Sequence, residues 1–408
     1  MEIPAELTIG ERVARARITR GISQNALAGL IGRSPGWVSQ VERGVLSLDR
    51  KSIVLQLADV LGVDATMLEG RSPAPLVPGK PGRALTISEL RLALMRWATP
   101  AISRPSPIEP RHGVGQHGVD QLRERVRMAG QLRQDGRFSD LAVSLPALLD
   151  DLRETSDVVE AANDHNAVHG LAAEAMHHAC AMTKKLGHLD LAWMSAELAG
   201  LRARHTDDRL LVAANAWNHL EVYKAANAPG PARALALATL DDLAEGLDAA
   251  SPGQLSLWGT LHLQAALIAS FWNNRQAVTD HLREADDAAR RLGGDANHYE
   301  TMFGPTNVAI HRVAIAVELG DARAAVELGE RIDASGLGRE RQARLAIDLA
   351  RAYEQSRNHD KALNYLLAAE KLAPDYVRPH VLVREIVGVQ LRRAKPELRL
   401  LAKRTGIM

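Results

Sequence analysis

One face of a short predicted helix carries side chains that can recognise a partner by hydrogen bonding. The helix lies in the stretch Ser34–Gly44, SPGWVSQVERG, where Ser34 is placed to cap it and Pro35 takes the first helical position. At about 100° per residue, three side chains point into the domain: Ser34, Val38 and Val41. The opposite face carries small or hydrogen-bonding residues: Gly36, Ser39, Gln40 and Arg43.

A second set of candidate residues combines aromatic rings with polar side chains in the middle of the chain. Eight of the 14 aromatic residues lie between Trp193 and Phe303. Asparagine amides can hold a peptide backbone or a ligand carbonyl, and aromatic rings supply buried area. Each ring alone is also explained by core packing, so the evidence is the cluster. The predicted ligand-binding residues are Asn215, Trp217, Asn218, Trp258, His262, Phe303, Asn307 and His311.

Patterns typical of catalysis or metal binding are not found in the sequence. It has no glycine-rich phosphate loop and no H-E-x-x-H motif. His165 and His169 are four residues apart on a predicted helix, and His177 or His178 could join them around a metal. No cysteine or carboxylate completes a recognisable ligand set there. We therefore predict a protein that is not an enzyme and needs no cofactor or metal.

The composition favours a helical protein of two or three domains. The chain has 408 residues, of which 46% are hydrophobic but only 3% aromatic, a mixture that suits close-packed helices. Its net charge is +1, so any surface for nucleic acid must be local. Cys180 is the only cysteine, and no apolar run reaches the length of about 18 residues needed to cross a bilayer. We expect a soluble, cytoplasmic protein with no membrane contact.

Residues 9–70 predict five short helices with clear boundaries. Three capping residues precede helices: Ser23, Ser34 and Asp49. Glycines end four of the segments: Gly21, Gly32, Gly44 and Gly62. The second predicted helix has one apolar side, formed by Leu27, Leu30 and Ile31.

This N-terminal region resembles the helix-turn-helix of phage repressors and of the xenobiotic response element family. The residues that match its small, turn and core positions are Ala28, Gly32, Val38 and Val41, with SQNALA and VERG around them. The resemblance implies that the helix after Ser34 is a recognition helix that enters the major groove of DNA. The DNA-binding residues are then Gln24, Arg33, Ser34, Gly36, Trp37, Ser39, Gln40 and Arg43.

The resemblance also gives individual roles to these residues. Gln40 is the best base reader, because its amide can donate and accept at an adenine edge, and Ser39 is second. Gln24 falls where such repressors contact the phosphate backbone. Trp37 either presses on sugar and phosphate or covers the hydrophobic seam. A buried or half-buried ion pair is implied between Arg17 and Glu42, clamping the first and third helices.

Basic residues exceed acidic ones within this region. Eight lie between residues 9 and 51: Arg12, Arg15, Arg17, Arg20, Arg33, Arg43, Arg50 and Lys51. Only Glu11, Glu42 and Asp49 oppose them, which leaves an excess of five positive charges. We interpret this excess as the local electrostatic footprint of a DNA-binding domain.

A proline-rich linker is predicted at 71–118, followed by a helical array at 119–408. Eight of the 18 prolines lie in the linker, which is interrupted by a predicted helix at 86–97 that docks on the larger domain or a second subunit. The segment Ala343–Pro374 matches the tetratricopeptide spacing of two antiparallel helices. Looser copies suggest about six helix pairs, with a short helical end after Arg378.

The sequence thus predicts an all-α protein, in which a five-helix repressor-like domain is joined to a tetratricopeptide-like α-solenoid. As a whole it resembles helix-turn-helix regulators with a tetratricopeptide sensor, such as the peptide-responsive RRNPP-type quorum-sensing regulators and actinobacterial relatives. The resemblance implies a homodimeric bacterial transcriptional regulator that binds a palindromic operator in double-stranded DNA. A signalling peptide or small molecule in the repeats would control it. The alternative is a DNA-anchored scaffold whose repeats recruit a protein partner.

Overall fold

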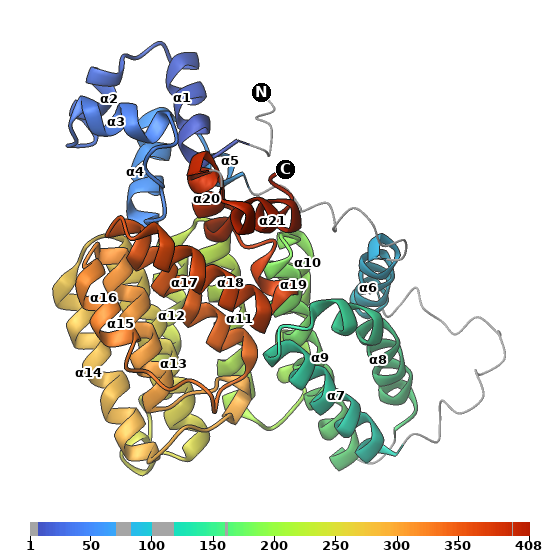
Figure 1. Cartoon of the computed structure of the whole chain (residues 1–408). Helices are drawn as coiled ribbons and strands as arrows, with labels where there is room; N and C mark the ends of the chain where they lie inside the picture. The colour runs from blue at the N-terminus through green and yellow to red at the C-terminus, as the bar shows by residue number, and fades with distance from the viewer. Residues whose placement is uncertain (1–6, 71–82, 100–117, 160–161, 394) are drawn as a thin grey trace. The chain divides into compact units, whose positions relative to one another are not determined.

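The computed structural model describes residues 7–70, 83–99, 118–159, 162–393 and 395–408 (Figure 1). Within these ranges every regular element is a helix, and the only β-type contact is an isolated bridge between Ala296 and Phe303. The all-α prediction is confirmed. No helix in the described ranges is both long enough and apolar enough to span a membrane.

The N-terminal domain contains the five short helices predicted from the sequence. They are α1 (Ile9–Thr19), α2 (Gln24–Leu30), α3 (Pro35–Glu42), α4 (Lys51–Leu61) and α5 (Ala65–Glu69). The Ser23 and Ser34 hydroxyls cap α2 and α3 by accepting hydrogen bonds from backbone N–H groups. Asp49 does not cap α4, whose N-cap is Arg50 without a side-chain cap bond. That prediction was wrong because the Asp49 carboxylate has other partners, described below.

Helix α6 (Arg83–Ala98) contains the helix predicted at 86–97. It packs against α8 (Phe138–Val158), where Trp97 Nε1 donates to the Leu149 carbonyl at 3.0 Å. Arg96 and Asp150 form a bidentate ion pair on the same contact. The predicted linker prolines at 71–82 and 100–117 lie outside the described residues.

Six consecutive pairs of helices follow in the described ranges. The pairs are α7 (Val119–Gln134) with α8, α9 (Ala162–Lys185) with α10 (Leu189–Ala203), α11 (Arg209–Ala225) with α12 (Pro229–Leu243), α13 (Pro252–Phe271) with α14 (Arg275–Leu292), α15 (Pro305–Leu319) with α16 (Ala322–Gly329), and α17 (Arg339–Gln355) with α18 (His359–Leu372). The chain ends with α19 (Pro374–Val377), α20 (Val381–Gln390) and α21 (Pro396–Thr405). Short 3₁₀ turns occur at Leu247–Ala249, His298–Glu300 and Leu391–Arg393.

The chain forms two compact units. Unit 1 comprises Met1–Ala74, His262–Asp295 and Gly304–Met408, and so contains both the N-terminal domain and the C-terminal helices. Unit 2 comprises Pro75–Leu261 and Ala296–Phe303. The loop Ala296–Phe303 therefore belongs to unit 2, while the helices on either side of it in sequence belong to unit 1.

Candidate nucleic-acid interface and ligand cavity

Helix α3, the predicted recognition helix, is held in the N-terminal domain by a small apolar core. Val38 and Val41 are 1% exposed and pack with Leu27 of α2, which is fully buried. Two expected inward positions differ in the structure. Leu30 is 61% exposed because α2 ends there, and Ser34 is exposed because its hydroxyl caps the Trp37 N–H instead of entering the core.

The opposite face of α3 is accessible. Gly36 and Arg43 are exposed, and Ser39 and Gln40 are half-buried. A Cβ at Gly36 would meet only the Ser34 hydroxyl at 4.0 Å, so the start of the helix is open. Arg43 Nε donates to the Ser39 carbonyl at 3.2 Å, which directs the guanidinium along the helix end. The side chains predicted to read bases therefore lie on one accessible face.

A buried ion pair fixes the recognition helix to α1, at the position implied by the resemblance. Arg17 Nε donates to Glu42 Oε1 at 2.5 Å, and a second guanidinium nitrogen donates to Oε2 at 2.8 Å. Only 12% of the Arg17 side chain and 5% of the Glu42 side chain are exposed. Gln24 Nε2 also donates to Glu42 Oε2, at 2.7 Å. The Gln24 amide thus helps to hold α3, the helix that carries the accessible face.

Trp37 lies at the edge of this domain. Its side chain is half-buried and packs against the apolar core, while the Arg33 guanidinium lies 5.5 Å from the ring centroid. The ring therefore packs over the hydrophobic seam, and its predicted contact with sugar and phosphate stays a prediction. Arg33 itself is exposed, and its cation–π contact holds it beside the start of α3.

Part of the predicted positive footprint faces inward. Arg12 is buried and donates to the Leu68 carbonyl, Arg17 pairs with Glu42, and Arg50 donates to the Glu318 carbonyl. Burial lowers the pKa of Arg12 and of Arg50. Four of the eight basic residues stay exposed: Arg15, Arg20, Arg33 and Arg43. The outward charge is therefore smaller than the sequence count.

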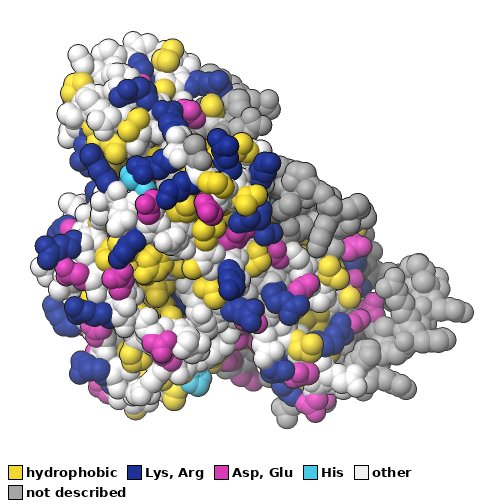
Figure 2. Space-filling model, in the orientation of Figure 1, with side chains coloured by type: hydrophobic (Ala, Val, Ile, Leu, Met, Phe, Trp, Pro, Cys, Tyr) yellow, Lys and Arg dark blue, Asp and Glu magenta, His cyan; other side chains and the backbone are white. Residues whose placement is uncertain are grey.

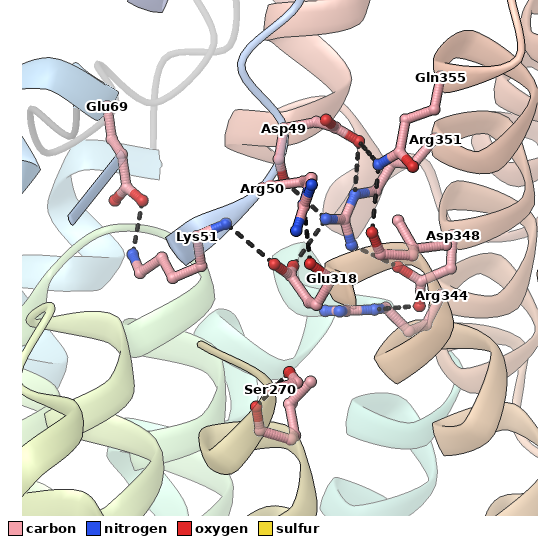
Figure 3. A network of polar contacts seen from close by, with 12 residues as sticks. Asp49, Arg50, Lys51, Glu69, Ser270, Glu318, Arg344, Asp348, Arg351 and Gln355 are labelled. Carbon is pink, nitrogen blue, oxygen red and sulfur yellow. Dashed lines mark hydrogen bonds and ion pairs between the residues drawn. The ribbon is translucent and has the colours of Figure 1, made fainter. Parts of the chain in front are cut away.

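A buried ionic network joins the N-terminal domain to the helices of unit 1, and Figure 3 shows its members. At its centre is Arg351 of α17, which is fully buried. One of its nitrogens donates to both the Asp49 carbonyl and Glu318 Oε1 at 2.6 Å, and another donates to Asp348 at 3.0 Å. Arg351 Nε lies 3.5 Å from the Asp49 carboxylate, which also accepts from Gln355 at 2.8 Å.

Charge balance makes this burial possible. Burial raises the pKa of Asp49, although Arg351 and the Gln355 amide act in the opposite direction. Burial also opposes ionisation of Asp348, but Arg344 and Arg351 outweigh it and hold the pKa of this carboxyl below its usual range. The pKa of Arg351 is raised, because the three surrounding carboxylates outweigh its desolvation.

Glu385 of α20 makes a second attachment. Its two carboxylate oxygens accept from the backbone N–H groups of Ile9, at 2.8 Å, and Leu48, at 3.1 Å. Burial raises the pKa of Glu385 to about 7, against the effect of these two donors. No periodicity or motif in the sequence signalled that Arg351 and Glu385 attach the N-terminal domain, because their partners in that domain are more than 300 residues away in the chain.

A separate cavity of about 400 Å³ lies within unit 2. Helix α9 contributes Glu174 and His177, and α11 contributes Asn215 and Asn218. The loop Ala296–Phe303 contributes Asn297, Tyr299 and Glu300 to the lining, together with Asp208 at the N-cap of α11. Tyr299 and Glu300 have positive φ angles of 50° and 61°, a conformation that costs energy in residues other than glycine.

Most polar groups around the cavity are paired. Glu300 accepts from Arg133 at 2.6 Å and from Gln134 at 2.7 Å, and the Tyr299 hydroxyl donates to Asp208 at 2.9 Å. His177 Nδ1 lies 2.5 Å from Asn218 Oδ1.

Glu174 is the exception, because it makes no hydrogen bond within the described ranges. Its closest basic atom, His178 Nε2, is 3.9 Å away. Burial and the neighbouring Glu300 raise the pKa of Glu174 to about 7. Burial also keeps the pKa of His178 well below its usual range, so this imidazole is neutral and does not balance the carboxylate.

The predicted ligand-binding residues are distributed over both units. Asn215 and Asn218 line the cavity, and Trp217 lies next to His177 with its ring centroid 5.6 Å away. Phe303 is fully buried against Gly259, where an added Cβ would lie 1.9 Å from the ring, and Trp258 is half-buried on α13. Three others lie in unit 1, as buried residues of α13 and α15: His262, Asn307 and His311. Five of the eight residues thus lie in unit 2 and three in unit 1, and a ligand role for them stays a prediction.

The four histidines considered as metal ligands all lie on α9. His165 and His169 are in contact, with their Nε2 atoms 3.1 Å apart, and His169 stacks on His205. Burial lowers the pKa of His169 to about 4. No group of three or more potential ligands that could hold a metal occurs in the part of the chain that the structure describes.

Comparison with known proteins identifies the N-terminal domain. Residues 8–69 match the family described as a helix-turn-helix domain. Over 69 residues, the chain is 38% identical to the HTH-type transcriptional regulator RamB in two strains of Mycobacterium tuberculosis. This match covers 17% of the chain but only 14% of each relative.

One solved structure aligns with a larger part of the chain. The crystal structure of BtubC (BKLC) from P. vanneervenii aligns with 62% of this chain and 91% of its own, at 15% sequence identity and a TM-score of 0.33. The helix-turn-helix prediction is confirmed for the N-terminal domain, and the tetratricopeptide assignment stays a prediction.

Proposed function

We propose that this protein is a sequence-specific DNA-binding transcriptional regulator. The observation that carries the proposal is the accessible face of α3, held by a capped helix start and the Arg17–Glu42 ion pair inside a helix-turn-helix domain. Such a helix places its side chains against base edges in the major groove. The N-terminal similarity to a named transcriptional regulator supports the same function.

Gln40→Ala is expected to reduce binding to the preferred operator and to leave binding to random DNA almost unchanged. Gln40 is half-buried on the accessible face of α3, and an amide that pairs with an adenine edge contributes about 1–3 kcal/mol of discrimination. The measurement is a pair of titrations, with an operator found by footprinting the protein's own promoter and with a random duplex. Asn25→Ala, exposed on α2, is the control. Equal losses on both DNAs would show that Gln40 does not read bases.

Operator binding as a homodimer is part of the proposal. A single helix-turn-helix unit buries little surface, and dimers of such domains read two half-sites about 34–36 Å apart. Because unit 1 contains both the N-terminal domain and the C-terminal helices, contacts between copies of those helices would set the spacing of two recognition helices. Sedimentation of the full chain, alone and with a palindromic duplex, tests this. A complex with one protein per duplex would reject it.

The cavity of unit 2 is the proposed site of the controlling signal. Its volume suits a small molecule or the end of a peptide, and its lining offers three asparagine amides and an unpaired carboxylate. The loop Ala296–Phe303, which supplies Tyr299 and Glu300, is joined covalently to α14 and α15 of unit 1. A ligand that prefers one position of this loop would shift the equilibrium between two states of the regulator.

Glu174→Gln is expected to weaken binding of that signal at least about tenfold. The change removes the unpaired carboxylate at the cavity wall, and hydrogen bonds to a charged carboxylate are stronger than those to a neutral amide. The measurement is the rise in Tm of the full chain produced by a low-mass fraction of cell extract, over a dilution series. Asp241→Asn, an exposed carboxyl on α12, is the matched control. A fraction that stabilises wild type and Glu174→Gln equally would place the signal elsewhere, and a protein that co-purifies stably would favour the scaffold alternative.

A further inference from the structure

We propose that the C-terminal turn Leu391–Arg393 extends the DNA interface, with the Arg392 guanidinium contacting the phosphate backbone beside the end of the recognition helix. This inference rests on the proposed function, since it requires α3 to lie in the major groove. It adds a contact from the C-terminal end of the chain, a region that no helix-turn-helix match covers.

The first step is the position of α20 on the N-terminal domain. Glu385 accepts hydrogen bonds from the backbone of Ile9 and Leu48, so α20 lies between the start of α1 and the connection that follows α3. One helical turn further on, a Cβ at Gly388 would come within 3.1 Å of Thr8 Cγ2. The helix thus approaches the domain closely along its length.

The second step is the direction in which the chain continues. After α20 the turn Leu391–Arg393 passes the end of the recognition helix. A guanidinium nitrogen of Arg392 lies 3.6 Å from the point where a Cβ added to Gly44 would be. Gly44 has a positive φ of 61° and follows directly on Arg43, which belongs to the accessible face of α3. Arg392 and Arg43 therefore flank the same helix end.

The third step is the charge around this point. Arg392 is exposed and makes no ion pair or side-chain hydrogen bond within the described residues. Two carboxylates at the contact of α20 with the N-terminal domain are engaged, since Glu385 is buried and accepts from two backbone N–H groups, and Glu11 accepts from Thr8. From residue 381 to 408 the chain has seven basic residues and two acidic ones. Figure 2 shows several Lys and Arg side chains where the N-terminal domain adjoins the rest of unit 1.

Groove geometry identifies the partner of this charge. A helix with its side chains is about 10–12 Å across, and the major groove is about 12 Å wide, so phosphates line both flanks of a bound helix. A guanidinium beside the end of α3 meets one of these phosphates. Arginine suits this role because its planar fork can donate two parallel hydrogen bonds to phosphate oxygens.

The test is a salt titration of the full chain on a random-sequence 30-base-pair duplex. For Arg392→Ala we expect the slope of log affinity against log salt to become shallower by about 0.9, the value for one lost phosphate contact. At low salt, affinity should fall about threefold to tenfold, on random DNA and on the operator alike. Arg392→Lys should retain most of the slope, because it keeps the positive charge.

The control is Arg331→Ala, which removes another exposed arginine of unit 1. This arginine follows α16 and forms no ion pair with any residue that the structure describes. It should leave the slope unchanged. Equal slopes for wild type and Arg392→Ala would overturn the inference, as would the same loss in Arg331→Ala. If wild type itself binds neither duplex, the proposed function fails, an outcome distinct from a wild type that binds without help from Arg392.

Discussion

Arg351→Ala is expected to destabilise the protein by about 3–5 kcal/mol, because it strands three carboxylates around an empty position. Arg351 is fully buried, as is Asp348, while Asp49 and Glu318 are 5% and 8% exposed on their side chains. Without the guanidinium these groups lose their central donor and repel one another. The free energy of unfolding in urea, followed by tryptophan fluorescence, measures the loss.

Two further variants isolate this effect. Arg339→Ala removes an exposed arginine from the first turn of the same helix, α17, and should change stability by less than about 0.5 kcal/mol. Asp49→Asn combined with Arg351→Met removes charges of both signs, so the pair should cost less than the sum of the two single changes. If Arg351→Ala lowers the free energy of unfolding by less than about 1 kcal/mol, the ionic network does not stabilise the attachment of the N-terminal domain.

Arg17→Ala is expected to cost about 3 kcal/mol, and to act through stability before it acts on DNA. The change leaves Glu42 buried with only the Gln24 amide as a side-chain donor, and it frees the Ile22 carbonyl that Arg17 holds at 2.8 Å. Because Glu42 is the last residue of α3, the reading face should lose its fixed position as well. Arg15→Ala, exposed on the same helix, is the control.

A double-mutant cycle decides whether Arg17 and Glu42 act as a pair. In the cycle with Glu42→Gln, the double variant should be more stable than the sum of the single effects predicts, by about 1 kcal/mol or more. Thermal unfolding of all four proteins gives this coupling energy. Additive effects would mean that the two side chains have no net interaction energy, although they are close together.

The sequence revealed part of the cavity lining but not the buried ionic network around Arg351. Asn215 and Asn218 were identified because asparagines at helical spacing among aromatic residues are unusual, and both line the cavity. Glu174, Asp208 and Glu300 were not identified, because acidic residues in a helical protein are normally on the surface. Their place at the cavity wall depends on the loop Ala296–Phe303, which lines the cavity together with α9 and α11.

The sequence by itself determined the local structure: five short helices at 9–70, the caps at Ser23 and Ser34, and a regular series of longer helices after residue 118. These features follow from interactions between residues a few positions apart, so their signals can be found in short stretches. The Arg17–Glu42 pair could also be predicted from the sequence, because it belongs to a recurrent motif.

Only the tertiary structure decided which charges are exposed and which are buried. Of the eight basic residues between 9 and 51, half face inward or pair with other elements, and Asp49 pairs with Arg351 instead of capping α4. The contacts of Asp49 with Arg351 and of Arg50 with Glu318 join positions hundreds of residues apart and leave no periodic trace. They form because a charge that loses water on folding needs an opposite charge or a hydrogen-bond partner, and the packing of distant helices alone determines which partner is within reach.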